Sequence, residues 1–306
     1  MRIFKNRGDI YVPKGKYKTS KEAKILIAVL VVFVILSAVF VYYVAYSNNF
    51  SITEFFTPDS LQVEEDDDSS STETLPEVSG IKNFLFVLSN EDTDQMYVTA
   101  LIEVDLDNIA YKVCAISTET TVGNYQIDEI YESSGAGGVA SNLASYLGIT
   151  IDYYIDLDTD AYEDVFDAFG DVNYTLLEDV KYKDTTQYGY NVKISAGEQT
   201  IGGTNAMKLL RYYVDNGEDY TAINNFMLEC LHQQVNEENY EDREDLFSTF
   251  IQNCTTNITI KNFTEATNNL KVLSASSTGV NVYSVAVEYD GNTLTEQSIS
   301  DIGAYF

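Results

Sequence analysis

The chain has 306 residues and is strongly acidic, with 48 Asp and Glu against 18 Lys and Arg and a formal net charge of −30. This charge excludes nucleic acid as a natural partner, because binding to a polyanion requires a basic surface. One histidine and three cysteines without metal-ligand spacing exclude a zinc site and a disulfide framework, and they argue against serine–histidine catalysis.

The basic residues are concentrated at the N-terminus. Residues 1–24 carry eight Lys and Arg against two acidic residues, and residues 25–46 carry no charge. As a helix, the uncharged segment spans about 33 Å, which is enough for a hydrocarbon core of about 30 Å. Since basic flanks remain in the cytoplasm, the sequence predicts a cytoplasmic arm at 1–24, a single transmembrane helix at 25–46 and an extracellular remainder at the cell membrane. A cleaved signal peptide is the alternative, and the length of the apolar segment favours the anchor.

Residues 47–79 are predicted to form an acidic flexible linker. An acidic run at 64–68 precedes serines at 69–71, and apolar residues are few, which is typical of a solvated spacer. The run lacks the alternating ligands and the glycine of an EF-hand loop, so a spacer is favoured over a calcium site. From residue 80 to residue 306 the pattern becomes that of a globular domain.

The globular domain begins with three predicted strands. The apolar run at 84–88 is typical of a strand that is covered on both faces, and strands at 97–104 and 111–116 follow it. A glycine-rich segment at 132–138 then leads into a helix that ends at Gly148. Such a segment could hold phosphate on its amides, but without a full nucleotide-binding fingerprint it is predicted to be a plain loop.

A second group of elements follows the first helix. The pattern predicts a strand at 153–157, a helix that is capped by Asp160 and ended by Gly170, and a strand at 172–176. Together these elements would form a β-α-β unit. Polar residues at 181–193 are typical of a hairpin.

Three amphipathic helices complete the predicted elements. Their apolar positions recur at helical spacing over residues 206–213, 223–231 and 246–251. The mixture of strands and helices over about 220 residues predicts one α/β domain with a large core. If residues 220–235 and 240–253 form an antiparallel helix pair, Cys230 lies about 13 Å and Cys254 about 22 Å from the turn between them. This offset exceeds the limit of about 7 Å for a disulfide, and Cys114 lies in a different strand, so we expect free thiols.

Eight short segments occur in an order that is typical of a known family. They are NFLFVL at 83–88, TDQM at 93–96, LGITIDYY at 147–154, FDAFGDV at 166–172, ISAGEQTIGGTNAM at 194–207, LRY at 210–212, GEDY at 217–220 and TNIT at 256–259. No single segment is specific to one family. The ordered set of segments, behind an anchor and a linker, is considerably more specific. The domain thereby resembles the LytR-CpsA-Psr family of cell-envelope proteins, from about Asn83 to about Asp290.

The resemblance implies a fold and a chemistry. The implied fold is an α-β-α sandwich with a mixed central sheet, preceded by one N-terminal transmembrane helix. Members of the family transfer anionic glycopolymers from a polyprenyl-pyrophosphate carrier to peptidoglycan. The lipid tail lies in an apolar tunnel, and arginines and magnesium hold the pyrophosphate. Membrane lipid, a polyprenyl-phosphate carrier and a cell-wall glycopolymer are therefore the implied partners, and magnesium is the implied metal.

Four residues match functional positions of the family. Arg211 would grip phosphate, and Glu119 would assist as a metal ligand or a base. Asp94 and Asp219 would hold magnesium. Three of them also have a simpler interpretation: Arg211 in an ion pair, Asp219 as a helix N-cap and Asp94 as a solvated charge in an acidic turn.

Most of the arginines of the family site are absent. The family's proline-arginine-aspartate turn falls on residues 117–119, and other arginines fall on Tyr213, Ala222 and Asn225. A hydrogen bond to a charged group contributes about 1.5–3 kcal/mol, so the loss of three or four costs roughly 5–10 kcal/mol. The sequence therefore favours a membrane-anchored, non-catalytic binding or regulatory module. An active magnesium-dependent phosphotransferase and a purely structural envelope protein are the alternatives.

Overall fold

The computed structural model describes residues 75–90, 95–185, 189–217, 219–276 and 279–306. The predicted cytoplasmic arm, the predicted transmembrane helix and all but the end of the predicted linker lie outside these ranges. Within the described residues, every helix is too short or too polar to cross a bilayer.

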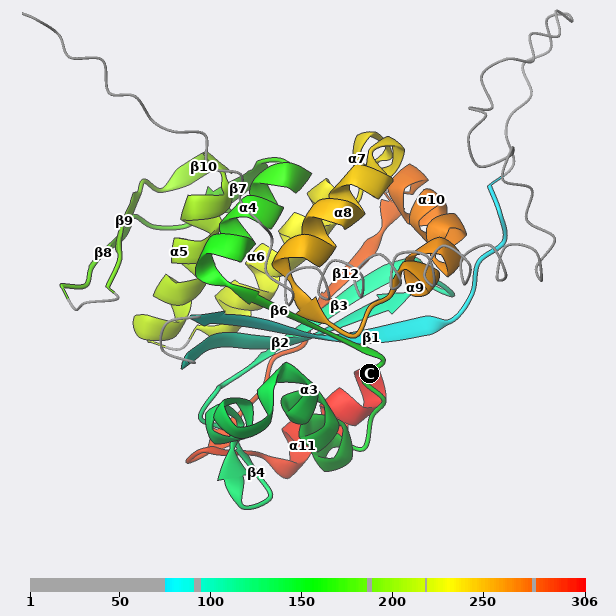
Figure 1. The fold of residues 1–306 in the computed structure, drawn as a ribbon. Helices are drawn as coiled ribbons and strands as arrows, with labels where there is room; N and C mark the ends of the chain where they lie inside the picture. The colour runs from blue at the N-terminus through cyan, green and yellow to red at the C-terminus, as the bar shows by residue number, and fades with distance from the viewer. Residues whose placement is uncertain (1–74, 91–94, 186–188, 218, 277–278) are drawn as a thin grey trace, which may run out of the picture. The chain divides into compact units, whose positions relative to one another are not determined.

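A six-stranded mixed sheet forms the centre of the domain (Figure 1). Its strands are β1 (Ile81–Asn90), β2 (Gln95–Asp105), β3 (Ala110–Ile116), β6 (Tyr153–Asp158), β11 (Thr255–Thr256) and β12 (Asn281–Ser284). They lie in the order β11-β6-β1-β2-β3-β12. β1 runs antiparallel to β2 and parallel to β6, while β3 runs antiparallel to β2 and parallel to β12.

Helices cover both faces of this sheet, so the domain has three layers (Figure 1). One face packs against α3 (Ile127–Leu147) and α11 (Glu296–Tyr305). The other lies under α4 (Thr159–Phe169), α5 (Gly203–Asp215), α6 (Tyr220–Gln234), α7 (Glu237–Glu241), α8 (Arg243–Asn253), α9 (Ile260–Glu265) and α10 (Thr267–Ala275). The predicted α/β fold with a mixed central sheet between helical layers is confirmed.

Strand β1 contributes to two apolar layers at once. Leu85 and Val87 join the core beneath α3, while Phe86 and Leu88 join the core beneath the larger helical layer. Because successive side chains of a strand point to opposite faces, a continuous apolar run suits a strand that is covered on both sides. The predicted interpretation of the run at 84–88 is confirmed.

Four short two-stranded ladders lie outside the central sheet. They pair β4 (Thr121–Val122) with β5 (Tyr125–Gln126), β7 (Val172–Leu176) with β10 (Gly197–Ile201), β8 (Val180–Lys183) with β9 (Asn191–Ile194), and β13 (Tyr289–Asp290) with β14 (Thr293–Leu294). The predicted β-α-β unit is wrong, because β7 pairs with β10 and not with the sheet that contains β6. Only the two end residues of β7 are buried, whereas a strand inside a parallel sheet is apolar on both faces.

Helices α3 and α4 begin at other residues than the sequence predicts. The predicted glycine-rich loop at 132–138 lies inside α3, where only Gly135 leaves the helical conformation, with a φ of 62°. Glycine adopts positive φ at little cost, so the helix is kinked there and continues. Helix α4 is capped by Asp158, whose carboxylate accepts a hydrogen bond from the Ala161 amide at 2.8 Å. The predicted cap, Asp160, lies in the first turn.

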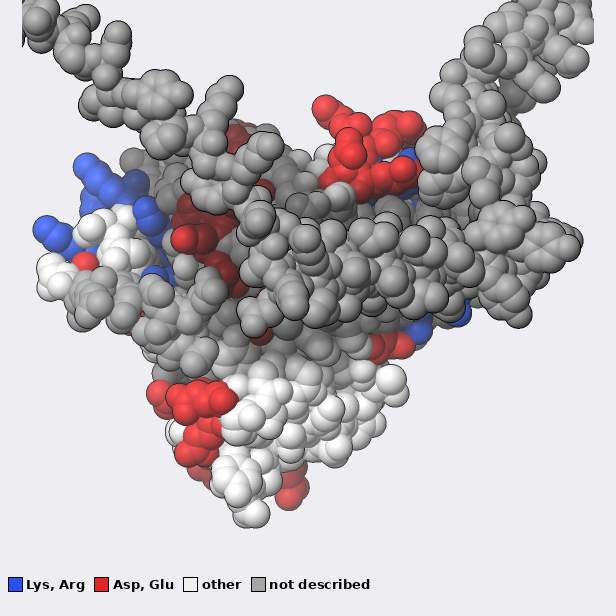
Figure 2. Space-filling model, in the orientation of Figure 1, with Lys and Arg blue, Asp and Glu red and all other residues white. Residues whose placement is uncertain are grey.

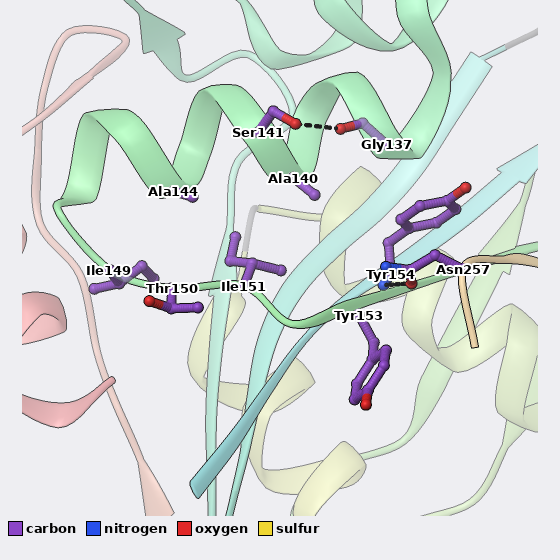
Figure 3. Close-up of a pocket in the computed structure, with 10 residues that line it drawn as sticks. All are labelled: Gly137, Ala140, Ser141, Ala144, Ile149, Thr150, Ile151, Tyr153, Tyr154 and Asn257. Atoms are coloured by element: carbon purple, nitrogen blue, oxygen red, sulfur yellow. Dashed lines mark hydrogen bonds between the residues drawn. The ribbon is translucent and has the colours of Figure 1, made fainter. Parts of the chain in front are cut away.

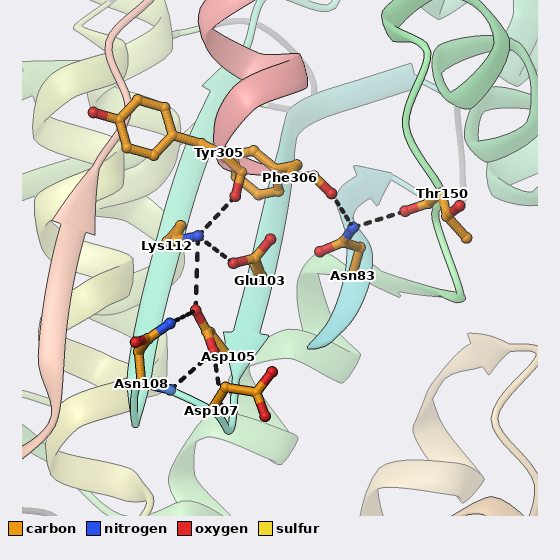
Figure 4. Close-up of polar contacts among 9 residues, drawn as sticks. All are labelled: Asn83, Glu103, Asp105, Asp107, Asn108, Lys112, Thr150, Tyr305 and Phe306. Carbon is orange, nitrogen blue, oxygen red and sulfur yellow. Dashed lines mark hydrogen bonds and ion pairs between the residues drawn. The ribbon is translucent and has the colours of Figure 1, made fainter. Parts of the chain in front are cut away.

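Polar contacts join the C-terminal helix to the sheet (Figure 4). The Lys112 ammonium group of β3 forms an ion pair with the buried Glu103 carboxylate of β2 and donates a hydrogen bond to the Tyr305 carbonyl at 2.8 Å. The side-chain amide of Asn83 donates a hydrogen bond to a main-chain oxygen of Phe306 at 2.8 Å. Burial raises the pKa of the Glu103 carboxyl even though Lys112 opposes this shift.

All three cysteines are free thiols, as predicted. Cys114 is buried, whereas Cys230 and Cys254 are half-buried. Burial raises the pKa of the Cys114 and Cys254 thiols to about 12. They therefore remain protonated near neutral pH and are poor nucleophiles.

Candidate functional site

Arg211 of α5 is buried against two tyrosine rings. Only 7% of the residue is exposed. The guanidinium carbon lies 3.9 Å from the centroid of the Tyr97 ring and 4.3 Å from that of the Tyr190 ring. A guanidinium group over an aromatic face is stabilised by the quadrupole of the ring. The two rings thus hold the cation through its planar faces, and the burial of the residue leaves little of its N–H edge exposed to a phosphate.

Further tyrosines extend this cover. The Tyr182 ring lies 5.1 Å from Tyr190 and 6.3 Å from Tyr212, and the rings of Tyr212 and Tyr213 are 5.9 Å apart. Burial, and then the Asp215 carboxylate, raise the pKa of the Tyr190 hydroxyl, so this phenol is neutral. Neutral phenols supply none of the positive charge that a pyrophosphate requires.

Asp219 is an exposed helix cap. Its carboxylate accepts a hydrogen bond from the Ala222 amide at 2.9 Å, at the first turn of α6. Its own amide donates to the Tyr213 carbonyl at 2.8 Å, which ties the start of α6 to the helix that carries Arg211. The N-cap interpretation thus has direct structural support. A metal-binding role stays a prediction.

Glu119 is exposed in the turn that follows β3. Its amide donates to the Ser117 hydroxyl at 3.2 Å, and the Ser117 amide donates to the Tyr289 hydroxyl at 2.9 Å. The Tyr289 ring lies 6.0 Å from the ring of Tyr220, the first residue of α6. This chain of contacts places the turn near the cap of α6.

Three of the four predicted site residues therefore belong to segments at one end of the sheet. Thr99 of β2 pairs with Ile116 of β3, so the start of β2 and the end of β3 share this end, and the Tyr97 ring of β2 contacts Arg211. Asp94, the fourth residue, lies outside the described residues. The aromatic cover of Arg211 was not predicted, because no sequence pattern links Tyr97 and Tyr190 to an arginine on a distant helix.

The carboxylates described here do not by themselves form a magnesium site. Among the residues that the structure describes, no three Asp, Glu, His or Cys side chains are grouped so that they could hold an ion. Magnesium requires several oxygen ligands in octahedral geometry, and the Asp219 carboxylate is already engaged by the Ala222 amide. A magnesium site that includes Asp94 stays a prediction, because Asp94 lies outside the described residues.

An apolar cavity of about 490 Å³ lies under the larger helical layer. Its walls come from α6, α8, α9, α10 and the nearby ends of β1 and β6. The apolar side chains that line it include Phe84, Ile155, Leu231, Leu246, Phe250 and Phe263. Lys82 and Arg243 also border it. An apolar cavity with a few polar groups at its border is typical of a site for a hydrophobic ligand.

The cavity and Arg211 lie far apart on the same face of the sheet. Asp219 caps one end of α6 and Leu231 lines the cavity near the other end, about 18 Å away at 1.5 Å per residue. Between them, the Tyr162 ring packs 6.0 Å from Phe86 and 5.8 Å from Phe166. Neither Arg211 nor the two tyrosines that contact it are among the residues that line the cavity.

A second cavity, of about 370 Å³, lies between α3 and the start of β6 (Figure 3). The Asn257 side chain accepts a hydrogen bond from the Tyr154 amide at 2.9 Å and donates to the Asp152 carbonyl at 3.0 Å. The Ser141 hydroxyl donates to the Gly137 carbonyl at 3.0 Å. These polar groups already bond to the main chain, which favours the larger cavity as the ligand site.

The family resemblance implied an apolar tunnel, but the sequence did not predict which elements close the larger cavity. Helices α9 and α10, which close it, follow the last predicted helix. Their apolar residues are sparse, and α9 has only six residues, which is too short for a clear helical period.

These features define an α/β sandwich with an apolar cavity under one helical layer and a buried arginine at the other end of the sheet. The model described as the LytR_cpsA_psr family matches residues 105–302, well over half of the chain. The chain belongs to the LytR-CpsA-Psr family of cell-envelope proteins.

Solved structures share the fold at low sequence identity. A putative transcription regulator from Eubacterium siraeum DSM 15702 is 18% identical with a TM-score of 0.66, over 80% of this chain and 98% of that one. TagV from B. subtilis is 16% identical with a TM-score of 0.58, over 75% and 96%. A structure described as TagT bound to LI-WTA is 17% identical with a TM-score of 0.53, over 74% and 88%. No curated protein sequence matches the chain.

Proposed function

We propose that the protein is a membrane-anchored envelope module that binds a lipid chain in its apolar cavity and does not transfer glycopolymer. The observation that carries this proposal is the cavity of about 490 Å³ between α6, α8, α9, α10 and the sheet. Burial of an acyl or isoprenoid chain contributes about 0.8 kcal/mol per methylene group. A polyprenyl-phosphate carrier is the candidate ligand, in keeping with the family.

The burial of Arg211 against tyrosine rings supports the proposal that the protein does not transfer glycopolymer. Phosphoryl transfer depends on cations that neutralise charge in the transition state. Here the single retained arginine lies under the rings of Tyr97 and Tyr190, and neutral tyrosines surround it. The protein would thus hold or present a lipid-linked envelope component rather than react with it.

The predicted anchor at 25–46 would hold this module at the outer face of the cell membrane. The basic arm at 1–24 would remain in the cytoplasm, and the linker at 47–79 would give the domain reach. Membrane lipids and lipid-linked glycopolymers would both be accessible there.

Lipid extracted from the purified full chain tests the proposal. Mass spectrometry is expected to find an isoprenoid or acyl lipid at a stoichiometric level. Ala266 lines the cavity, so Ala266→Trp is expected to remove most of this lipid by filling the cavity. Ala275 is exposed outside the cavity, and Ala275→Trp serves as the matched control. Equal lipid content in both variants would argue against the cavity as the site, and a lipid-free wild type would favour a structural protein.

An active magnesium-dependent phosphotransferase is the second candidate. It is favoured by the position of Arg211, Asp219 and the turn at 117–119 at one end of the sheet. We expect no magnesium-dependent release of phosphate from a polyprenyl pyrophosphate. Turnover by the wild type that disappears in Arg211→Ala would establish the enzyme instead.

A further inference from the structure

Strand β12 lies at one edge of the six-stranded sheet. Among the described strands, only β3 pairs with it. All four of its residues are exposed, and Val282 and Tyr283 are 47% and 46% exposed. The strand at the opposite edge, β11, has only two residues. The β12 edge is therefore the longer edge that the sheet presents to another strand.

The backbone of β12 directs two residues toward this edge. The amides of Asn281 and Val285 donate to carbonyl oxygens on the β3 side at 3.0 and 2.9 Å. Successive residues of a strand point their N–H and C=O groups to opposite sides. The groups of Val282 and Ser284 therefore point away from β3. Such a row of outward donors and acceptors is a template for a further strand.

The β12 edge lacks the usual protection against pairing. Proteins protect exposed edges with charged residues, proline or a β-bulge. Residues 272–287 contain no charged residue and no proline, and β12 pairs with β3 without a shift in register. The segment from Val280 to Val287 is rich in valine, which favours extended strands. A partner strand on this edge would explain why it carries no protection.

Two exposed tyrosines lie beside the edge on one face of the sheet. Tyr283 pairs with Lys112 in the register of β12 and β3, and the Lys112 ammonium group lies 5.9 Å from the centroid of the Tyr305 ring. Tyr305 is 46% exposed at the end of α11. Tyrosine is enriched in protein interfaces, because its ring buries apolar area while its hydroxyl remains hydrated.

The charge of the domain indicates which partner fits. Acidic residues greatly outnumber basic ones over residues 75–306, and Figure 2 shows acidic side chains over α7 and beside α3. Two copies of the domain therefore repel each other over much of their surface. The segment 281–287 is uncharged, so two copies that meet there place no like charges opposite each other. Two identical antiparallel strands are also self-complementary about a two-fold axis.

We propose that β12 pairs with β12 of a second copy of this chain, antiparallel and centred on Tyr283. In this register the outward groups of Val282 bond those of Ser284 in the other copy, and the reverse. The two Tyr283 residues form the central pair without hydrogen bonds, in which side chains lie closest. The two sheets become one continuous sheet. This association goes beyond the lipid-binding function and does not depend on it.

Cysteine cross-linking of the full chain in detergent micelles tests the pairing. Tyr283→Cys places two thiols opposite each other, within the limit of about 7 Å between Cα atoms for a disulfide. Under mild oxidation it is expected to form at least about fivefold more covalent dimer than Tyr125→Cys. Tyr125 is the matched control, because it is 62% exposed on another strand, β5. The wild type corrects for cross-links through Cys230 and Cys254.

A proline substitution tests the backbone contact. Ser284→Pro removes an outward N–H group that the ladder with β3 does not use, and proline is tolerated at such edge positions. Each dimer loses two inter-strand hydrogen bonds, so the dissociation constant from sedimentation equilibrium is expected to rise about tenfold or more. Ser284→Ala keeps the N–H group and is expected to change it less than about twofold. Circular dichroism checks that both variants are folded.

Three results would overturn the inference. The first is equal cross-linking of Tyr283→Cys and Tyr125→Cys, which would mean that the copies have no preferred contact at β12. The second is equal association of Ser284→Pro and Ser284→Ala, which would place the contact elsewhere in the chain, such as the predicted anchor. The third is a monomeric wild type together with no cross-link at Tyr283→Cys, which would leave the edge to an extended segment of another protein.

Discussion

Asp219 illustrates how one carboxylate can satisfy a structural and a functional interpretation at once. Its bond to the Ala222 amide satisfies one of the unpaired donors at the start of α6. The same exposed position near the end of the sheet suits a metal ligand. A helix cap can use the oxygen of a neutral amide or of a charged carboxylate, whereas magnesium prefers the oxygen of a charged carboxylate.

Substitution of Asp219 separates these roles. Asp219→Ala is expected to lower the free energy of unfolding by about 1 kcal/mol, because the cap is lost, and Asp219→Asn by only a few tenths. The measurement is urea denaturation with and without magnesium. If magnesium stabilises the wild type and fails to stabilise Asp219→Asn, then Asp219 is a ligand as well as a cap.

At the scale of the element, helix α11 depends on a buried cation for its attachment to the sheet. Lys112 is largely buried, with 15% of its side chain exposed, and the Glu103 side chain is 1% exposed. The same ammonium group bonds the carbonyl of Tyr305 at the end of the helix (Figure 4). One side chain thus compensates a buried carboxylate and joins two layers.

Lys112→Met is therefore expected to cost about 3–5 kcal/mol of stability, because it leaves the Glu103 carboxylate buried without its cation. Lys82→Met is the matched control on β1, where the ion pair with Asp152 is more exposed, and it is expected to cost less than about 1 kcal/mol. Chemical denaturation of both variants provides the comparison. If both variants lose a similarly small free energy of unfolding, the buried Lys112–Glu103 pair contributes no more to stability than the exposed Lys82–Asp152 pair.

At the scale of the whole molecule, the chain has the fold of the family, and three of its predicted site segments lie at one end of the sheet. The motif matches in the sequence predict that Thr118, Tyr213 and Ala222 stand where the family carries arginines. Restoring the arginines asks whether the geometry of that site survives. The substitutions are Thr118→Arg, Tyr213→Arg and Ala222→Arg together.

The triple variant is expected to bind an isoprenoid pyrophosphate several kcal/mol more tightly than the wild type, since each charged contact contributes about 1.5–3 kcal/mol. Isothermal titration calorimetry in the presence of magnesium measures the gain. Thr264→Arg, Tyr283→Arg and Ala275→Arg add the same charge at exposed positions elsewhere and control for net charge. An equal gain in the control, or none in either variant, would mean that the site is no longer formed.

The sequence alone predicted the elements whose signal is local. The runs that became β1, β2, β3 and β6 and the helices α5, α6 and α8 were each recognisable, because apolar residues repeat with the period of the element they form. The ordered motifs also predicted the family and, with it, the mixed sheet between helical layers. Arg211 and Asp219 came from the same motifs, and Glu119 came from the match of residues 117–119 to a turn of the family.

Only the tertiary structure decided which segments meet. The pairing of β7 with β10, the tyrosine cover of Arg211 and the closure of the cavity by α8, α9 and α10 all join residues that are distant in the chain. Such contacts depend on how complete elements pack and exclude water. The periodicity of one segment carries no information about which other segment packs against it. The sequence therefore predicted individual helices and strands, while packing decided which side chains meet at Arg211 and around the cavity.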